Sequence, residues 1–286
     1  YLQSHPTDVV IVVDDLASTM AAAIVTKKQA ITLAHIAAGT RSFDITMPKE
    51  INRLVIDGLS DILFTAGFSN NSIANKEGAE LSKVYMVGNI LIDNIRYNRE
   101  RVEGMRLNDI DALAGLPLKE GCYIVFTLNR KALLADQENL EKMLRVLCET
   151  AGDLPIIAPL RDSAVQVIMA LGLKKNISLH NLHIVKPLDY LQFAYLTSHA
   201  QGIVTDSGNV AEEATFNNIP CITLNSYTEH IETVKVGSNV LVGEDAELLR
   251  SAFADMVSGT WKKCGIPDRW DGRSAERIVQ ILLEHR

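Results

Sequence analysis

Short apolar runs alternate with amphipathic stretches along nearly the whole chain of 286 residues. Consecutive apolar and β-branched residues are typical of buried strands, which we predict at residues 8–13, 30–36, 61–65, 84–87, 122–128, 155–158, 182–185, 202–205 and 220–224. The amphipathic stretches predict helices at residues 18–25, 48–59, 69–78, 90–97, 139–150, 162–171, 190–198, 209–216, 245–257 and 273–285. Because these strands and helices alternate, the pattern indicates an α/β fold with parallel sheets.

The alternation is interrupted once, between residues 98 and 120. This stretch is rich in charge at its start and contains Gly115, Pro117 and Gly121 near its end, which favours a connection between domains. At roughly 150 residues per domain, the length of the chain also suggests about two domains. In parallel sheets of this kind, ligands bind beyond the carboxyl ends of the strands.

Composition and charge exclude several classes of function. Apolar residues make up 47% of the chain and charged residues 22%, as is ordinary for a soluble globular protein. The formal net charge of -7 argues against a nucleic-acid backbone as partner, and no apolar run reaches the ~18 residues of a membrane helix. The four cysteines are widely spaced without a CxxC pair, which indicates reduced thiols and a cytoplasmic protein.

A strand, a small turn and a helix follow one another at residues 202–216, with Asp206, Ser207 and Gly208 in the turn. The backbone N–H groups at the start of such a helix form a ready anion site, and Glu213, one turn further on, is a candidate acceptor for sugar hydroxyls. The alternative interpretation is an ordinary N-capped helix with solvated glutamates.

Two other strand ends carry polar candidates. Asp14 and Asp15 follow the first predicted strand, where a carboxylate either caps the next helix or reacts with a ligand. Arg130 and Lys131 follow the strand at 122–128 and are either phosphate ligands or solvated cations. The histidine pair at 180 and 183 lacks a third ligand, so we predict neither a metal nor a cofactor.

Six segments occur along the chain in the order found in one known family: VVDDLASTM at 12–20, HIAAGTR at 35–41, PKEINR at 48–53, VGN at 87–89, PLDYLQF at 187–193 and TDSG at 205–208. Together they closely resemble the non-hydrolysing UDP-N-acetylglucosamine 2-epimerases, and the resemblance covers essentially the whole chain. It implies an α/β fold of the glycosyltransferase-B type with two Rossmann-like, doubly wound domains. It further implies that about the first 80 residues of a typical member are absent, so that the first domain is incomplete.

With the resemblance in view, we predict three segments: a partial N-terminal Rossmann-like domain at 1–115, a C-terminal UDP-binding domain at 116–271, and a C-terminal helix at 272–286 that packs back on the first domain. The resemblance implies the epimerisation of UDP-GlcNAc to UDP-ManNAc by elimination and re-addition of UDP. Its implied ligand is UDP or a UDP-N-acetylhexosamine, without nucleic acid or membrane as partner. A homodimer and a role in cell-surface polysaccharide biosynthesis are also implied.

The family pattern assigns roles to individual residues of this chain. Asp15 falls on a catalytic aspartate. The positions that fall on substrate-binding residues of the family are Asn129, Arg130, Leu188, Phe193, Ser207, Gly208, Asn209, Glu213 and His230. Within this set, Ser207 to Asn209 correspond to the phosphate turn and Glu213 to the glutamate that binds the ribose.

Other positions depart from the family pattern. Ala37 and Lys49 stand where the family has glutamates, and Asn129 and Arg161 stand where it has histidines. A single general acid or base contributes about 10²–10⁴ to a rate, so these changes favour an alternative in which the chain binds a nucleotide sugar without turning it over. A glycosyltransferase with the same architecture is a further alternative, although no acceptor site is evident.

Overall fold

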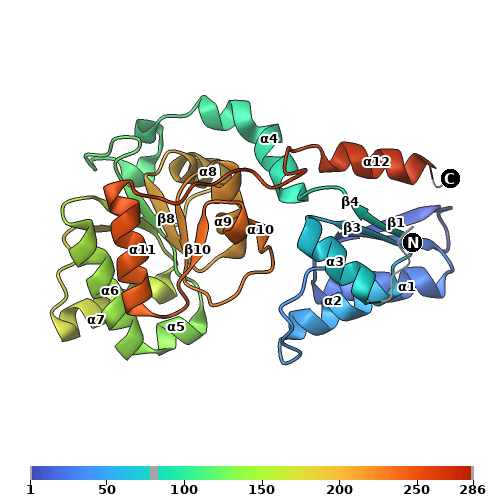
Figure 1. The fold of residues 1–286 in the computed structure, drawn as a ribbon, viewed down its shortest axis with the longest axis horizontal. Helices are drawn as coiled ribbons and strands as arrows, with labels where there is room; N and C mark the ends of the chain where they lie inside the picture. The colour runs from blue at the N-terminus through green and yellow to red at the C-terminus, as the bar shows by residue number, and fades with distance from the viewer. Residues whose placement is uncertain (1, 78–82, 285–286) are drawn as a thin grey trace. The chain divides into compact units, whose positions relative to one another are not determined.

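The structure is a computed structural model that describes residues 2–77 and 83–284. The chain forms two compact units (Figure 1). Unit 1 comprises residues 1–97, 229–232 and 267–286, and unit 2 comprises residues 98–228 and 233–266. Within the described residues, no helix is long and apolar enough to cross a membrane.

Unit 1 is built on a parallel sheet in the order β1-β2-β3-β4. Its strands are β1 (Val9–Val13), β2 (Thr32–Ala38), β3 (Ile62–Thr65) and β4 (Val84–Met86). The helices that follow them are α1 (Ala17–Lys28), α2 (Pro48–Leu59), α3 (Phe68–Lys76) and α4 (Ile90–Glu103), and the division between the units falls within α4.

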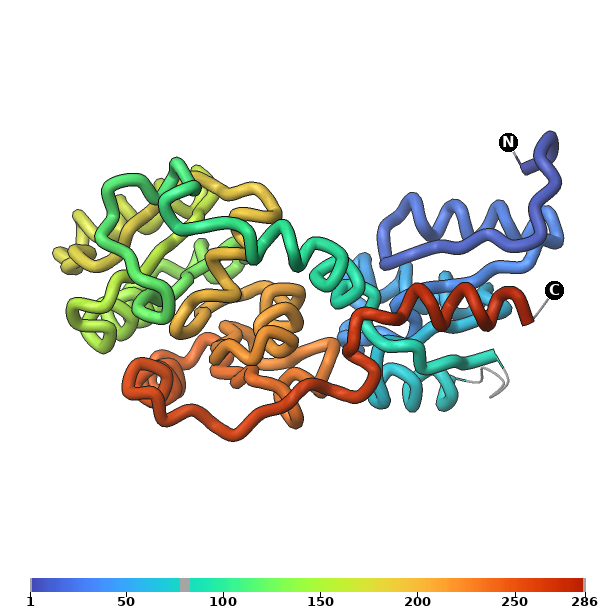
Figure 2. The backbone as a smooth tube through the Cα atoms, turned by 90° about the horizontal axis from the view of Figure 1, so that it is seen from above, coloured from blue at the N-terminus to red at the C-terminus, as the bar shows by residue number. Residues whose placement is uncertain are grey.

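The last helix of the chain, α12 (Ser274–Glu284), lies along the strands of unit 1 (Figure 2). Its buried side chain Ile278 packs with Ala34, Ile62, Phe64 and Val87 in one apolar cluster. Burial of one apolar stripe therefore holds this helix on the sheet.

Strand β1 differs from the prediction that it is buried on both faces. Its sequence is entirely apolar, but only Val12 is buried, whereas Ile11 and Val13 are 47% and 46% exposed. The reason is topological, because β1 is an edge strand that pairs only with β2 among the described strands. An apolar run therefore predicts the strand correctly but not how many faces of it are covered.

Unit 2 is built on a six-stranded parallel sheet in the order β10-β9-β8-β5-β6-β7. Its strands are β5 (Ile124–Phe126), β6 (Ile156–Pro159), β7 (Leu182–Val185), β8 (Gly202–Thr205), β9 (Cys221–Thr223) and β10 (Asn239–Leu241). The strand order reverses between β5 and β8, and such a switch point is where open α/β sheets bind their ligands.

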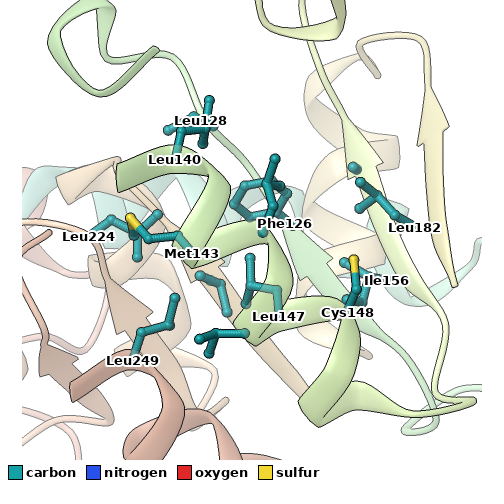
Figure 3. Close-up of a cluster of buried hydrophobic side chains, with 14 of the residues drawn as sticks. Phe126, Leu128, Leu140, Met143, Leu147, Cys148, Ile156, Leu182, Leu224 and Leu249 are labelled. Atoms are coloured by element: carbon teal, nitrogen blue, oxygen red, sulfur yellow. The ribbon is translucent and has the colours of Figure 1, made fainter. Parts of the chain in front are cut away.

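Helices cover both faces of the unit 2 sheet. Those of the first cluster are α5 (Lys131–Ala135), α6 (Gln137–Ala151), α7 (Asp162–Lys175) and α11 (Ala246–Ser258). Figure 3 shows Leu140, Met143 and Leu147 of α6 in the same apolar cluster as Phe126 of β5. A second cluster joins the sheet to α8 (Tyr190–Ser198), α9 (Gly208–Phe216) and two 3₁₀ turns, Leu107–Asp109 and Asp111–Leu113. A short helix, α10 (Glu232–Lys235), completes the elements.

Several elements differ from the predicted ones. The sequence did not predict β10, α5 or α10, each of which is five residues long or less. Helix α4 continues to Glu103, well past the predicted end at Tyr97, and takes in part of the predicted connection. The predicted helix ends at Gly78 and His285 lie outside the described residues.

Candidate active site

The carboxylate of Asp15 lies directly after β1 and is held by cations from helix α2. It is 3% exposed, and its Oδ2 atom accepts a hydrogen bond from Arg53 Nε at 2.8 Å, with Arg53 Nη2 at 2.7 Å. Lys49 Nζ lies 3.3 Å from the other oxygen, Oδ1. The alternative in which Asp15 caps helix α1 is wrong, because the N-cap is Leu16 and no side chain caps this helix.

Arg53 connects this carboxylate to two others in unit 1. Its Nη1 atom lies 2.7 Å from Glu229 and 3.3 Å from Glu50. Burial lowers the pKa of Arg53, but the hydrogen bonds and charges of Glu229 and Asp15 outweigh this effect and hold the pKa above its ordinary value. Arg53 is therefore a permanent cation shared by three acidic side chains.

Glu50 fixes the loop that precedes helix α2. Its carboxylate accepts hydrogen bonds from the backbone N–H groups of Ser42 and Phe43 at 2.9 and 3.0 Å, and from the Ser42 hydroxyl at 2.9 Å. Burial raises the pKa of Glu50, but these hydrogen bonds and the charge of Arg53 lower it further, so the pKa lies below its usual value.

Sequence reasoning did not select Glu50, Arg53 or Glu229. A signal was present for the first two, because an i, i+3 pair of opposite charges within PKEINR places both side chains on one face of a helix. Nothing local pointed to Glu229, which belongs to segment 229–232 and lies far along the chain from the other members of unit 1.

His230 also lies in unit 1, whereas the other predicted substrate-binding residues lie in unit 2. Its Nδ1 atom is 3.1 Å from Asn70 Oδ1, and its ring meets the ring of Trp270 edge to face at 6.1 Å between centroids. Trp270 is fully buried and donates its indole N–H to the carbonyl of Ala66. His230 is thus placed by packing and a hydrogen bond within unit 1.

In unit 2, the loops after β5 and β8 meet at the switch point through one carboxylate. Asp206 Oδ2 accepts hydrogen bonds from the backbone N–H groups of Asn129 and Arg130, both at 2.6 Å. Asp206 is 8% exposed, and its main-chain carbonyl accepts a further bond from Asn225 Nδ2 at 3.3 Å. This side chain therefore fixes the backbone of the loop that carries two predicted ligand residues.

The Arg130 side chain is not simply a solvated cation, as one interpretation of the sequence held. Its guanidinium donates to the carbonyl of Leu224 at 3.0 Å and to Asn225 Oδ1, and it lies 3.1 Å from Glu244. The side chain is 38% exposed, so one edge of the guanidinium is fixed while the group still reaches solvent.

Helix α9 begins beside this loop with an open N-terminus. Its N-cap residue, Ser207, makes no side-chain capping bond, and the Ser207 backbone N–H donates to Thr205 Oγ1 at 3.0 Å. A Cβ built on Gly208 would meet no other atom within 4 Å. The first-turn N–H groups of a nine-residue helix are therefore not covered by a side-chain cap, as an anion site requires.

Glu213 is buried, which overturns the alternative of solvated glutamates on α9. It is 9% exposed and Glu212 is 7% exposed, because their neighbours Ala211 and Ala214 pack into the apolar cluster beneath the helix. Burial, and to a lesser extent the charge of Glu212, raises the pKa of Glu213 to about 7. Such a carboxyl changes charge near neutral pH.

The two predicted apolar contacts, Leu188 and Phe193, are partly buried and pack on the same cluster as α9. Among the described residues, no group of three or more His, Cys, Asp and Glu side chains could hold a metal ion.

Comparison with known proteins identifies the family to which this chain belongs. The model of the family described as UDP-N-acetylglucosamine 2-epimerase matches residues 1–283. The UDP-N-acetylglucosamine 2-epimerase of Methanocaldococcus jannaschii is 35% identical over 98% of this chain and 76% of its own length. The chain belongs to the UDP-N-acetylglucosamine 2-epimerase family. These matches confirm the family resemblance that the six sequence segments indicated.

A further relative and a solved structure also show similarity to this chain. A UDP-2,3-diacetamido-2,3-dideoxy-D-glucuronate 2-epimerase of Pseudomonas aeruginosa is 33% identical over 96% of this chain and 74% of its own length. The M. jannaschii enzyme, solved in complex with UDP-GlcNAc and UDP, superposes with a TM-score of 0.82 at 34% identity, over 99% of this chain and 77% of that one.

More distant structures confirm the architecture. A lipopolysaccharide outer core galactosyltransferase has a TM-score of 0.58 at 11% identity, over 98% of this chain and 77% of that one, and shows likeness of fold alone. The predicted α/β fold of two Rossmann-like domains in the glycosyltransferase-B class is confirmed. The predicted domain boundaries and the roles of the individual site residues stay predictions.

Proposed function

We propose that this member of the family interconverts UDP-GlcNAc and UDP-ManNAc. A base removes the C2 proton as the bond between C1 and the UDP oxygen breaks, and UDP then adds back to C1 while a proton returns to C2 from the other face. The observation that carries the proposal is the Asp15 carboxylate, which is buried at a strand end and clamped by Arg53. A carboxylate held in this way is ionised and fixed in one orientation, which is the positioning that removal of a proton from a bound substrate requires.

Unit 2 contains the residues proposed to bind UDP. The open N-terminus of α9, with Ser207, Gly208 and Asn209, supplies backbone N–H groups for phosphate oxygens. Glu213 would accept hydrogen bonds from the ribose hydroxyls, and Phe193 with Leu188 would contact the uracil. Support comes from the M. jannaschii structure, which was solved in complex with UDP-GlcNAc and UDP.

Proton NMR of UDP-GlcNAc in deuterated water tests the proposed reaction directly. Epimerisation through C2 replaces the C2 proton by deuterium, so its signal should decay in proportion to protein concentration. Asp15→Asn should slow this loss by about 10²–10⁴, as removal of a general base does. The matched control is Asp14→Asn at the exposed neighbouring position, where Asn tolerates the left-handed backbone at φ 67°. Equal rates for the two variants would refute the role of Asp15.

A second candidate function is binding of the nucleotide sugar without turnover. It is favoured by Ala37, which has no group that transfers a proton, and by Lys49, whose ammonium pairs with Asp15. Calorimetric titration that detects UDP binding, together with a stable C2 proton signal, would select this function. In that case Ala37→Glu with Lys49→Glu should raise the exchange rate by at least about 10², the lower end of one acid–base contribution.

The binding residues have their own test. Glu213→Ala should weaken UDP binding by about tenfold, which corresponds to the loss of roughly one hydrogen bond to a charged group. Glu212→Ala is the matched control, since it removes an equally buried carboxyl from the same helix. If the Glu213 variant binds UDP as the wild type does, the ribose assignment is wrong. A homodimer and a cytoplasmic location stay predictions from the family resemblance and the cysteine pattern.

A further inference from the structure

The backbone is left-handed at three positions where β1 and β2 end. Asp14, Ala37 and Gly39 have φ angles of 67°, 69° and 70°. At Ala37 the pairing register between β2 and β3 also shifts by one residue, as in a β-bulge. Residues other than glycine seldom adopt this conformation unless the surrounding structure holds them in it. Residues held in this way cluster at functional sites.

His35 supplies the support at Asp14. It lies on β2 opposite Val12, is 2% exposed, and reaches along β1 so that its Nε2 atom lies 3.1 Å from the Asp14 carbonyl. Its Nδ1 atom lies 2.6 Å from Asp57 Oδ1. Because a carbonyl can only accept, Nε2 is the donor to Asp14, and the bond to Asp57 orients the ring for it.

Asp57, on helix α2, ties this contact to the second left-handed segment. Its Oδ2 atom accepts a hydrogen bond from the Gly39 N–H at 2.9 Å and lies 2.8 Å from Arg41. Burial raises the pKa of Asp57, but His35 and Arg41 lower it further, so the pKa lies below its usual range. Asp57 is therefore a carboxylate acceptor for both strand ends.

The next residue after Asp14 is the proposed base. The Asp15 carbonyl accepts a hydrogen bond from Asn52 at 2.9 Å, and the Asp15 carboxylate accepts one from Arg53. Two successive carbonyls are thus anchored from different elements, Asp14 from β2 and Asp15 from α2. The peptide between Asp14 and Asp15 is therefore held on both sides, and the Asp15 side chain starts from a backbone that is fixed by these contacts.

We propose that His35 and Asp57 are positioning residues, which hold the backbone at Asp14 so that Asp15 presents its carboxylate in one orientation. The role rests on the proposed epimerase function, since it is Asp15 that would remove the C2 proton. The His35 side chain itself is buried, and its ring contacts the Asp14 carbonyl and the Asp57 carboxylate.

Two substitutions of His35 separate the two contacts of its ring. A glutamine amide nitrogen lies about as far along the side chain as Nε2 and can still donate to Asp14. An asparagine nitrogen reaches only as far as Nδ1 and can pair with Asp57 alone. His35→Gln should therefore preserve the orientation of Asp15, whereas His35→Asn should lose it.

The signal to follow is the Nε–Hε group of Arg53 in a ¹⁵N-edited NMR spectrum of the full chain, because this group donates to Asp15. We expect His35→Asn to increase its hydrogen-exchange rate by at least about tenfold, and His35→Gln to leave the rate close to that of the wild type. Leu33→Ala, at a buried apolar position on the same strand, controls for a loss of stability without a change at the pair of His35 and Asp57, here called the dyad. Unchanged protection in His35→Asn, or equal loss in both His35 variants, would overturn the proposal.

Kinetics give the second readout. His35→Asn should lower the turnover number for C2 exchange by up to about 10²-fold at nearly constant KM, because misplacement of a reacting group by an ångström costs about that much. His35→Gln should keep a turnover number close to that of the wild type. A rise in KM that accompanies the fall in turnover, or a fall in turnover no larger than that of Leu33→Ala, would count against positioning. A wild type that shows no C2 exchange refutes the proposed function, while the Arg53 signal still decides whether the dyad orients Asp15.

Discussion

Asp15 follows β1 in unit 1 and Asp206 follows β8 in unit 2, yet the two buried carboxylates have different partners. Asp15 is paired with the side chains of Arg53 and Lys49, and part of that pairing is exposed, since the Lys49 side chain is 65% accessible. Asp206 accepts two backbone N–H groups from the neighbouring loop. A strand followed by Asp is thus a local pattern with two outcomes: a carboxylate held by cationic side chains, or a carboxylate that braces the main chain of a neighbouring loop.

The difference follows from what lies beside each strand end. In unit 1 the helix α2 delivers charged side chains to the end of β1, whereas in unit 2 the strand order reverses and brings the β5 loop against β8. Charged partners leave a carboxylate able to exchange one contact for a ligand. Backbone partners belong to the fold and cannot be replaced without moving the loop.

Removal of Arg53 should give the largest effect on this comparison. Arg53→Leu leaves Asp15 and Glu50 buried without their shared cation, and breaking a buried pair in this way costs about 3–5 kcal/mol of unfolding free energy. Urea denaturation of the variant and the wild type measures it. A loss below about 1 kcal/mol would show that the Asp15 cluster is held together by other contacts.

The pH dependence of unit 2 should come next in size. Because the pKa of Glu213 is raised from 4.5 to about 7, folding favours its protonated form. Its stabilising contribution is fully present below pH 4.5 and is lost as the pH rises through about 7, a change of about 3 kcal/mol. In Glu213→Gln, the unfolding free energy should lack this decrease between pH 4.5 and about 7. The variant should be more stable than the wild type at pH 8. Parallel curves for the two proteins in urea titrations from pH 4 to 8 would contradict the burial effect.

A smaller effect is expected at Asp206. Asp206→Ala leaves the backbone N–H groups of Asn129 and Arg130 without their acceptor, which should cost about 1–3 kcal/mol. Because the variant also releases the loop that carries these residues, UDP affinity should fall along with stability. A variant that loses affinity but keeps full stability would place Asp206 in direct contact with the ligand and remove the contrast with Asp15.

Lys49 should matter least for stability. Its ammonium pairs with Asp15 from the solvent side, so Lys49→Ala should change the unfolding free energy by less than about 1 kcal/mol. The same urea experiment makes it the matched control for Arg53→Leu, since both variants remove a cation from Asp15. If the two variants lose the same unfolding free energy, the exposed Lys49 and the buried Arg53 contribute equally to stability, and the difference in their exposure has no effect.

Much of the fold was predictable because apolar runs and amphipathic stretches are local signals. The strands at 182–185 and 202–205 and the helices at 48–59 and 190–198 have the bounds that the sequence predicted. β10 escaped prediction because three residues, Asn-Val-Leu, become a strand only by pairing with β9. The exposed side of β1 escaped for the same reason, since burial depends on which neighbour a strand has.

The candidate site divides in the same way. Asp15, Ser207 and Glu213 were selected from the sequence because each lies at a strand end or in the first turns of a helix, where the chain order alone brings functional groups to one edge. Arg53 and Glu229 were not, because Arg53 reaches Asp15, and Glu229 reaches Arg53, only after α2 and segment 229–232 have packed in unit 1.

The sequence by itself determined the alternation of strands and helices, the family and the positions of the polar strand ends. Each of these depends on short segments and on their order along the chain. Tertiary structure alone decided which carboxylates are buried, which are paired with cations, and that Glu213 has its pKa raised to about 7. The physical reason is that desolvation and charge pairing depend on distances between residues far apart in the chain.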